Sequence, residues 1–295
     1  MNVTADSVRQ LRERTGAGMM ECKKALLESR GDLEAAAEIM RKSGHAKADS
    51  KATRIAAEGR IAHAASADGK RGVLVEVNCE TDFVAREADF AAFADAVAQA
   101  ALADGADTPA AVLAAARPGG TTLEEQRRAL VARIGENISV RRLARLAAPG
   151  VLGSYLHGTR IGTLVALAGG DAKLARDLAM HVAASNPAYV DAAAVPATRV
   201  DKEREILAAQ ASAAGKPAAI VSKMVAGRLA KFLAEITLVG QRFVKDPEVT
   251  VGTLLQRASA RVTGFARLEV GAGIEKKQEN FAAEVMAQVT GSAQR

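Results

Sequence analysis

Aromatic residues are scarce in this chain of 295 residues: they make up 3% of it, and tryptophan is absent. Stacking platforms for single-stranded nucleic acid are built from aromatic side chains, so their scarcity weakens that class of function. Hydrophobic residues nevertheless make up 49% and charged residues 25%, which is typical of a globular protein rather than a disordered one. A chain of this length is expected to form about two or three domains.

Cysteine is also rare, with only Cys22 and Cys79 in the sequence. Two cysteines cannot build a cysteine-rich zinc site or a disulfide framework, so reduced thiols in a cytoplasmic protein are the simplest interpretation. Residues 1–7 lack the basic, apolar and small-residue pattern of a signal peptide. No run of about 18 uncharged apolar residues occurs, so we expect no membrane span and a cytoplasmic location.

Motifs of catalytic and phosphate-binding sites are missing. The sequence contains no GxSxG elbow, no GxGxxG after its first expected strand and no GxxxxGK[ST] loop. None of the histidines has a metal-ligand spacing such as HExxH, and His181 lies on an apolar helix stripe typical of a core histidine. We therefore expect no enzyme, no catalytic residue, no bound metal and no cofactor. An enzyme whose site assembles from distant positions remains an alternative, and turnover of a small substrate by the isolated chain would support it.

Positive charge exceeds negative charge by a net +6, and it is concentrated only in residues 41–60. A solvated linker is the plainer interpretation of this basic segment. A nucleic-acid footprint is the sharper one, and strongly salt-dependent binding to RNA or DNA would support it. The chain lacks the aromatic RNP pattern, the zinc-finger spacing and the basic region with heptads that accompany such footprints. We therefore expect no nucleic-acid partner.

The N-terminal part is patterned as three short helices with apolar residues at helical spacing. Residues suited to start or end these helices stand at their expected ends, namely Thr4, Gly16, Gly31 and Asp32. This arrangement resembles the ubiquitin-associated type of three-helix domain, to which we assign residues 1–54. The polar stretch at residues 43–51 is predicted to be a linker within that assignment.

An α+β core is predicted next. Residues 73–77 alternate as a half-buried strand does, and a loop and an amphipathic helix follow them. A similar order of hairpin and helix recurs after Gly150, which indicates a repeat. We interpret the two units as related halves of one core. The first half is assigned to residues 55–145, and the second to residues 146–190 and 235–263.

Two helical appendages complete the predicted α+β fold. Helical patterns on either side of residues 215–217 predict an antiparallel hairpin inserted into the core, to which we assign residues 191–234. Further on, residues 265–270 alternate as a strand does, and Asn280 can cap a last helix. Residues 264–295 are therefore assigned to a C-terminal helical module.

One loop of the first half carries an unusual pair of residues. The strand at residues 73–77 runs into a loop where Asp82 precedes Phe83, a large aromatic residue in a chain that has few. This pattern leaves two interpretations open. The phenyl ring can fold back into the core, or it can form an exposed wedge beside a charge.

Several blocks of this sequence resemble the signature of the elongation factor Ts family, in the family's order and over nearly the whole length. The blocks are residues 11–26, 73–85 (VLVEVNCETDFVA), 135–138, 153–158, 181–185, 215–217 and 264–275. The departures are mild, because Glu21 stands where an aspartate is common and alanine is unusually abundant. Neither departure touches the loop that carries Asp82 and Phe83.

The resemblance implies a guanine-nucleotide exchange factor in translation, without chemistry of its own. Members bind the GTPase elongation factor Tu in its GDP form, and their acidic-aromatic loop enters near its Mg²⁺ site, displaces the ion and promotes GDP release. Carried over to this chain, the loop consists of Thr81, Asp82, Phe83 and Val84. The resemblance assigns further partner contacts to His157, Arg12, Met19 and Met20. It also implies that the helical hairpin supports either a homodimer or a heterotetramer with the partner.

A helical interaction scaffold is a competing interpretation. Such a protein would bind a partner without altering its nucleotide affinity. It would explain the helical domains, but it would not explain why an acid and an aromatic residue stand together in the loop at residues 81–84.

Overall fold

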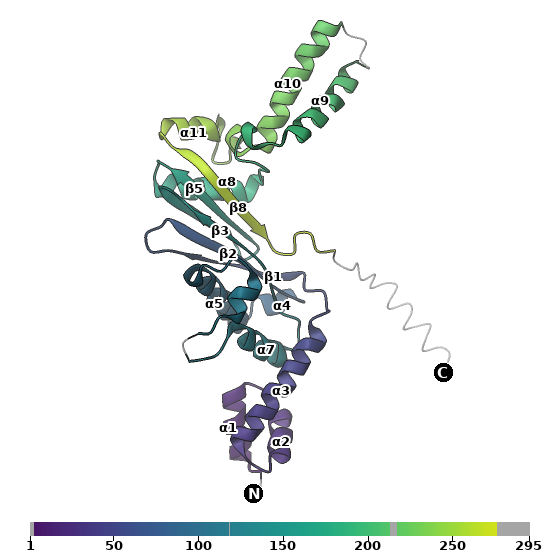
Figure 1. The fold of residues 1–295 in the computed structure, drawn as a ribbon, viewed down its shortest axis with the longest axis vertical. Helices are drawn as coiled ribbons and strands as arrows, with labels where there is room; N and C mark the ends of the chain where they lie inside the picture. The colour runs from purple at the N-terminus through teal and green to yellow at the C-terminus, as the bar shows by residue number, and fades with distance from the viewer. Residues whose placement is uncertain (1–2, 118, 213–216, 276–295) are drawn as a thin grey trace, which may run out of the picture.

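The computed structural model describes residues 3–117, 119–212 and 217–275. They form an elongated molecule in which a helical bundle, a core of two sheets and a helical hairpin follow one another along the long axis (Figure 1). The chain has a mixed α+β fold, as the sequence predicts.

The N-terminal bundle forms for the reasons that the sequence indicates. The side chain of Thr4 accepts a hydrogen bond from the backbone of Ser7 in a capping box. The side chain of Asp32 caps the third helix by accepting from the backbone N–H groups of Glu34 and Ala35. Gly16 ends the first helix with a φ of 68°, a left-handed conformation that favours glycine. Leu11 and Leu26 lie fully buried at the centre of this bundle. The helices are α1 (Ala5–Thr15), α2 (Met19–Glu28) and α3 (Leu33–Lys51).

The linker predicted at residues 43–51 is wrong, because α3 continues without a break to Lys51. Its second half packs along α7, and a Cβ atom at Gly44 would lie 3.3 Å from the Cβ of Ala132. Ala48 is fully buried in the first core. This part of the helix is amphipathic, and its many polar residues led to the prediction of a linker. Several of these residues pair with carboxylates, as Lys47 does with Glu21.

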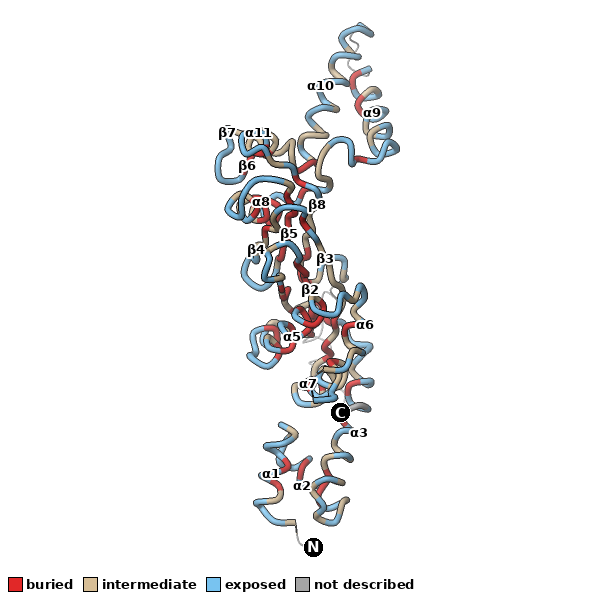
Figure 2. The backbone as a smooth tube through the Cα atoms, turned by 60° about the vertical axis from the view of Figure 1, so that its left-hand side comes forward, coloured by how far each residue is buried: buried red, intermediate tan, exposed pale blue. Residues whose placement is uncertain are grey.

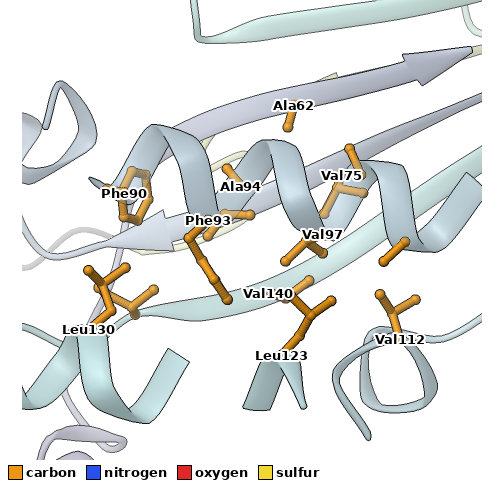
Figure 3. Packing of buried hydrophobic residues seen from close by; sticks show 14 of the residues in the cluster. Ala62, Val75, Phe90, Phe93, Ala94, Val97, Val112, Leu123, Leu130 and Val140 are labelled. Atoms are coloured by element: carbon orange, nitrogen blue, oxygen red, sulfur yellow. The ribbon is translucent and has the colours of Figure 1, made fainter. Parts of the chain in front are cut away.

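The first sheet is antiparallel, with the order β1-β2-β3. Helices cover one of its faces, and Figure 3 shows Phe90, Phe93 and Val97 of α5 packed against the strands and against α7. The other face is covered too, so β2 is buried along almost its whole length and is not the half-buried strand that was predicted. The elements are β1 (Glu58–Ala65), β2 (Arg71–Cys79), α4 (Asp82–Ala85), α5 (Ala88–Asp104), α6 (Pro109–Ala114), α7 (Leu123–Ile134) and β3 (Ser139–Ala147).

The second sheet is antiparallel as well, with the order β4-β5-β8, and α8 covers its outer face. Both halves of the core therefore run through a hairpin, a helix and a third strand in the same order. The domain boundary predicted at residue 264 does not hold, because it cuts β8, which pairs with β5 along its length. The elements are β4 (Val151–His157), β5 (Ile161–Ala168), α8 (Ala172–Ser185), β6 (Arg242–Phe243), β7 (Asp246–Thr250), α11 (Val251–Arg257) and β8 (Arg261–Glu269).

The two sheets pack face to face, which gives four layers: helices, sheet, sheet and helices (Figures 1 and 2). Ile61 and Leu74 of the first sheet meet Leu164 and Leu268 of the second. A Cβ atom at Gly162 would lie only 2.5 Å from a methyl carbon of Ile61, so glycine at this position allows the close approach of the sheets. Burial of apolar surface between the sheets joins the two halves into one core.

The helical hairpin extends from the second half and consists of α9 (Ala197–Ser212) and α10 (Ala218–Ile236) (Figure 1). It is the antiparallel pair that the sequence predicts. Leu207 and Ala211 of α9 are buried, whereas α10 contains no fully buried residue. The predicted break at residues 215–217 and the last helix expected at Asn280 fall wholly or largely outside the described residues.

The described part of the chain lacks two features. No helix there is long and apolar enough to cross a membrane. The same residues contain no group of three or more histidine, cysteine, aspartate or glutamate side chains that could hold a metal ion.

Candidate partner-binding site

One end of the two-sheet core gathers most, but not all, of the contact residues that the sequence predicts. The last residue of β2, Cys79, pairs with Glu58 at the start of β1. The turn between β4 and β5 is attached to this same end, because the backbone N–H of Ile61 donates to the carbonyl oxygen of Thr159 at 2.7 Å. Arg160 of that turn also forms an ion pair with Glu58. The loop after β2 and the turn after β4 therefore lie at one end of the sandwich.

The loop after β2 contains a single helical turn, α4, which directs Phe83 outward. Thr81 caps this turn by accepting a hydrogen bond from the backbone N–H of Val84 at 3.4 Å. Val84 and Ala85 are buried in the first core, so the inner side of α4 is anchored. The side chain of Phe83 is 77% exposed. Of the two interpretations left open by the sequence, the structure therefore shows the exposed one.

Asp82 lies beside Phe83 at the edge of this turn. Its carboxylate forms an ion pair with Arg86, one helical turn further on, at 2.7 Å. The side chain of Arg86 is largely exposed and that of Asp82 is about half exposed, and solvated pairs of this kind are weak. The carboxylate of Asp82 is therefore available to a partner that offers a better donor or a stronger charge.

Glu136 forms hydrogen bonds with the first residues of the loop. Its carboxylate accepts hydrogen bonds from the backbone N–H groups of Glu80 and Thr81, each at 3.0 Å, and from the hydroxyl of Thr81 at 2.7 Å. Sequence reasoning placed Glu136 in a block that resembles the family, but it assigned the residue no role. Its partners are 55 and 56 positions away, so no local pattern could have indicated the contact.

The next residue, Asn137, makes a second set of contacts with the same region. Its backbone N–H donates to the carboxylate of Glu80 at 2.6 Å. Its side-chain amide donates to the carbonyl oxygens of Ala52 and Arg54, which follow α3. The segment between α7 and β3 thus connects the N-terminal bundle to the loop that carries Phe83.

Glu76 is a fully buried carboxylate on β2, close to this end of the core. A β-bulge in β3 opposite Glu76 breaks the alternation of side chains, so both Arg141 and Arg142 reach it. Burial would raise the pKa of Glu76, but hydrogen bonds from the backbone of Gly271, from Arg142 and from Asn78 outweigh it and hold the pKa below its usual range. This carboxylate therefore joins the turn after β8 to the first sheet.

The other predicted contact residues occupy two different places. His157 ends β4, is exposed, and lies with its Nδ1 atom 3.2 Å from the hydroxyl of Tyr155, at the same end of the core as Phe83. Arg12, Met19 and Met20 are exposed on α1 and α2 of the bundle. Figure 1 places that bundle at the N-terminal end of the long axis, away from α4. The structure therefore brings His157 to the loop's end of the core, but not the three bundle residues.

Two buried groups in the core, His181 and Cys79, have structural roles. His181 is the core histidine that the sequence predicts: its Nε2 atom lies 3.0 Å from Gln241 Oε1 and its Nδ1 atom accepts from the backbone of Val244, while burial lowers its pKa. Burial, reinforced by the charge of Glu136, raises the pKa of Cys79 to about 12. This thiol is protonated at neutral pH and is not a nucleophile.

Known proteins are similar to this chain over its whole length. A family model described as "Elongation factor TS" matches residues 80–272. The "Elongation factor Ts" of Thioalkalivibrio sulfidiphilus is 60% identical over 294 residues, which cover 99% of this chain and 100% of the relative. The proteins of that name from Methylococcus capsulatus and Legionella pneumophila are 61% and 54% identical, over 99% and 97% of this chain and 100% and 98% of the relatives.

Proposed function

The chain belongs to the elongation factor Ts family, and on that premise we propose that it binds elongation factor Tu with GDP bound and accelerates the release of GDP. The protein provides binding energy for this exchange and no bond-making chemistry. The observation that carries the proposal is the exposed phenyl ring of Phe83, which projects beside the carboxylate of Asp82 from a turn anchored on its inner side.

The exposed ring supplies a driving force for opening a partner's nucleotide site. Burial of a phenylalanine side chain that was in water stabilises a complex by about 1.5–3 kcal/mol. If the ring fits only between two helices of the GTPase that have moved apart, this free energy favours the moved arrangement. The buried residues Val84 and Ala85 hold the turn in place while Phe83 inserts.

Asp82 completes the wedge in this proposal. A GTPase holds its nucleotide largely through the phosphates and the Mg²⁺ ion that neutralises them. A carboxylate that approaches the opened site favours an arrangement in which the partner's groups turn away from Mg²⁺. Loss of the ion leaves phosphate charge without compensation, so the affinity for GDP falls. Thr81 and Val84 set the direction of the pair, one as the cap and one as the buried anchor.

The remaining contacts spread the interaction over the partner. His157 would touch it beside the loop, and Arg12, Met19 and Met20 would touch it from the bundle. Coupling is reciprocal, so GDP weakens the binding of the exchange factor by the same factor by which the exchange factor weakens GDP binding. Contacts at a distance from the nucleotide provide affinity that one inserted ring does not.

The helical hairpin is proposed to support assembly. Few residues of the α9–α10 pair are buried within the chain, and Ile206 and Ile220 are exposed on it. A second copy of the chain would cover such residues, which gives a homodimer or, with the GTPase bound, a heterotetramer. A cytoplasmic location follows from the proposed role beside the translation machinery.

Stopped-flow fluorescence of a labelled GDP bound to elongation factor Tu tests the proposed activity. The release rate is expected to increase with the concentration of the chain and then to saturate. A capture experiment should in parallel retain the GTPase without added nucleotide and lose it with excess GDP. A release rate that stays at the spontaneous value at every concentration would refute the proposal and would leave the scaffold interpretation.

A further inference from the structure

We infer that Glu136 is the positioning residue of the loop that carries Asp82 and Phe83. Its carboxylate fixes the direction in which the two side chains leave the core, although Glu136 itself touches neither of them in the contacts described above. This inference rests on the proposed function, because it concerns how the proposed wedge is held. It assigns a role to Glu136, which lies 55 positions after Thr81 in the sequence.

The hydrogen bonds of Glu136 are concentrated on the junction between β2 and α4. Regular pairing of β2 with β1 ends at Cys79, so the N–H groups of Glu80 and Thr81 have no partner in the sheet. Both donate to the same oxygen of Glu136, and the Thr81 hydroxyl donates to the other oxygen. All three donors are thus directed at one carboxylate, and a charged acceptor makes the stronger kind of hydrogen bond.

The hydroxyl of Thr81 carries this constraint into the helical turn. A hydroxyl has one proton to donate and two lone pairs that accept. Since its proton goes to Glu136, a lone pair remains to accept from the N–H of Val84, which is the bond that starts α4. The carboxylate therefore selects the rotation of the hydroxyl that caps the turn, and the turn decides where Phe83 points.

Glu136 is itself held in a rigid place. It follows Gly135, which ends α7 with a φ of 85° and donates its N–H to the carbonyl oxygen of Val131. Asn137 next to it donates its backbone N–H to the carboxylate of Glu80. The two segments thus exchange hydrogen bonds in both directions: Glu136 accepts from residues 80 and 81, and Glu80 accepts from residue 137.

The hydrophobic anchors of α4 are separate from the hydrogen bonds that Glu136 makes. Val84 and Ala85 pack into the first core, and no contact of Glu136 described above involves either of them. Loss of the carboxylate is therefore expected to loosen the direction of the turn without removing its anchor. This separation of direction from anchoring distinguishes a positioning residue from one that only stabilises the fold.

A single fluorophore at position 83 allows the effect of Glu136 on the motion of the loop to be measured without any partner. The chain has no tryptophan, so Phe83→Trp places the only indole at the tip of the wedge. In that background, Glu136→Ala is expected to increase the amplitude of fast local motion in time-resolved anisotropy at least twofold. Glu136→Gln is expected to give an intermediate value, because its amide oxygen still accepts from the two N–H groups. An anisotropy decay that Glu136→Ala leaves unchanged would overturn the inference.

Exchange kinetics with elongation factor Tu test the consequence in the natural sequence. Glu136→Ala is expected to lower the maximal GDP release rate on the order of tenfold, because a small displacement of Asp82 and Phe83 from their productive geometry is costly. The concentration of chain at half-maximal rate is expected to change less than the rate does, since the bundle contacts remain. In an Asp82→Ala/Phe83→Ala background, Glu136→Ala is expected to have no further effect. A full additional loss in that background would show that Glu136 acts elsewhere and would overturn the inference.

Two further variants keep the result interpretable. Thr81→Val removes both the hydroxyl bond to Glu136 and the cap of α4, but it keeps the carboxylate and its bonds to the two backbone N–H groups. It serves if Glu136→Ala fails to fold, and it is expected to shift the anisotropy in the same direction. Asp171→Ala is the matched control: Asp171 caps α8 by accepting from the backbone of Leu174, at the opposite end of the second sheet. It is expected to leave both the anisotropy and the release rate unchanged. If Phe83→Ala does not slow release, the wedge proposal fails while the anisotropy still reports on Glu136.

Discussion

Phe83 and Val84 are neighbours on one helical turn, yet Phe83 is 77% exposed and Val84 is 5% exposed. The turn is short and capped by Thr81, and successive residues of a helix point to different sides, so one side chain can be buried while its neighbour is exposed. The smaller apolar residue anchors the turn, and the larger one faces solvent. The chain has only 3% aromatic residues, and exposure of a phenyl ring to solvent is unfavourable unless a partner buries it.

Phe83→Ala is expected to lower the maximal rate of GDP release from elongation factor Tu by about 10- to 100-fold. The reason is the loss of about 1.5–3 kcal/mol from burial of the ring, at about 1.4 kcal/mol for each factor of ten. Stopped-flow release of labelled GDP measures this effect. Circular dichroism of the free chain should show an unchanged melting temperature, because the ring makes little contact with its own core. A release rate equal to that of the wild type would remove the wedge from the mechanism.

Asp82→Ala is expected to slow release and to change its dependence on Mg²⁺. If the carboxylate helps to dislodge the ion, added Mg²⁺ should suppress the wild-type rate more steeply than the already lower rate of the variant. Titrations of both proteins with Mg²⁺ at saturating concentrations of chain provide the comparison. Arg86→Ala is the matched control, and since its exposed pair with Asp82 is weak, we expect a change of less than about twofold. Identical Mg²⁺ dependence in the wild type and Asp82→Ala would exclude Asp82 from this step.

Local chemistry made much of the fold predictable. Thr4 and Asp32 cap helices because their side chains can accept from the first backbone N–H groups, and such signals are read within four residues. The strand at residues 73–77 and the one expected at residues 265–270 were found from their alternation. The helical hairpin followed from two amphipathic patterns on either side of a break.

What was missed depends on partners that are distant in the sequence. The prediction of a linker fails in the second half of α3 because the buried side of this helix is set by contact with α7, more than 70 residues later. Burial of β2 on both faces depends on the second sheet, which the alternation of the strand alone does not reveal. At the site, the pair Asp82 and Phe83 could be found by composition, whereas the contacts of Glu136 and Glu76 require the assembled core.

His157→Ala is expected to weaken the complex with elongation factor Tu by about two- to fivefold, a smaller effect than that of Phe83→Ala. The imidazole is exposed at the end of β4, so its loss removes a single contact and no core packing. Isothermal titration calorimetry measures the affinity. Tyr155→Phe removes the hydroxyl beside Nδ1 but keeps the imidazole, and it should therefore have a smaller effect still. Unchanged affinity in His157→Ala would remove the residue from the interface.

Glu76 predicts how the stability of the core depends on pH. The folded state holds the pKa of this carboxyl below its usual range, so ionised Glu76 stabilises the fold at neutral pH. This contribution is fully present above the unfolded-state pKa of about 4.3 and is lost as the pH falls through the lower pKa of the folded state. Glu76→Gln keeps the shape but leaves Arg141 and Arg142 without their shared carboxylate. We expect it to lower the free energy of unfolding at pH 7 by about 2–3 kcal/mol, since removing one partner of a buried ion pair is costly.

The size of that loss stays below the upper range for buried pairs, because the side chains of Arg141 and Arg142 are 28% and 36% exposed and can be hydrated again. Urea unfolding between about pH 3 and pH 8 measures the effect. The difference between the wild type and Glu76→Gln should be largest at neutral pH and should shrink below about pH 4. Glu13→Gln, on the exposed side of α1, is the control and should follow the wild type throughout. If the difference were the same at pH 3 as at pH 7, the charge of Glu76 would not be what joins the turn after β8 to the first sheet.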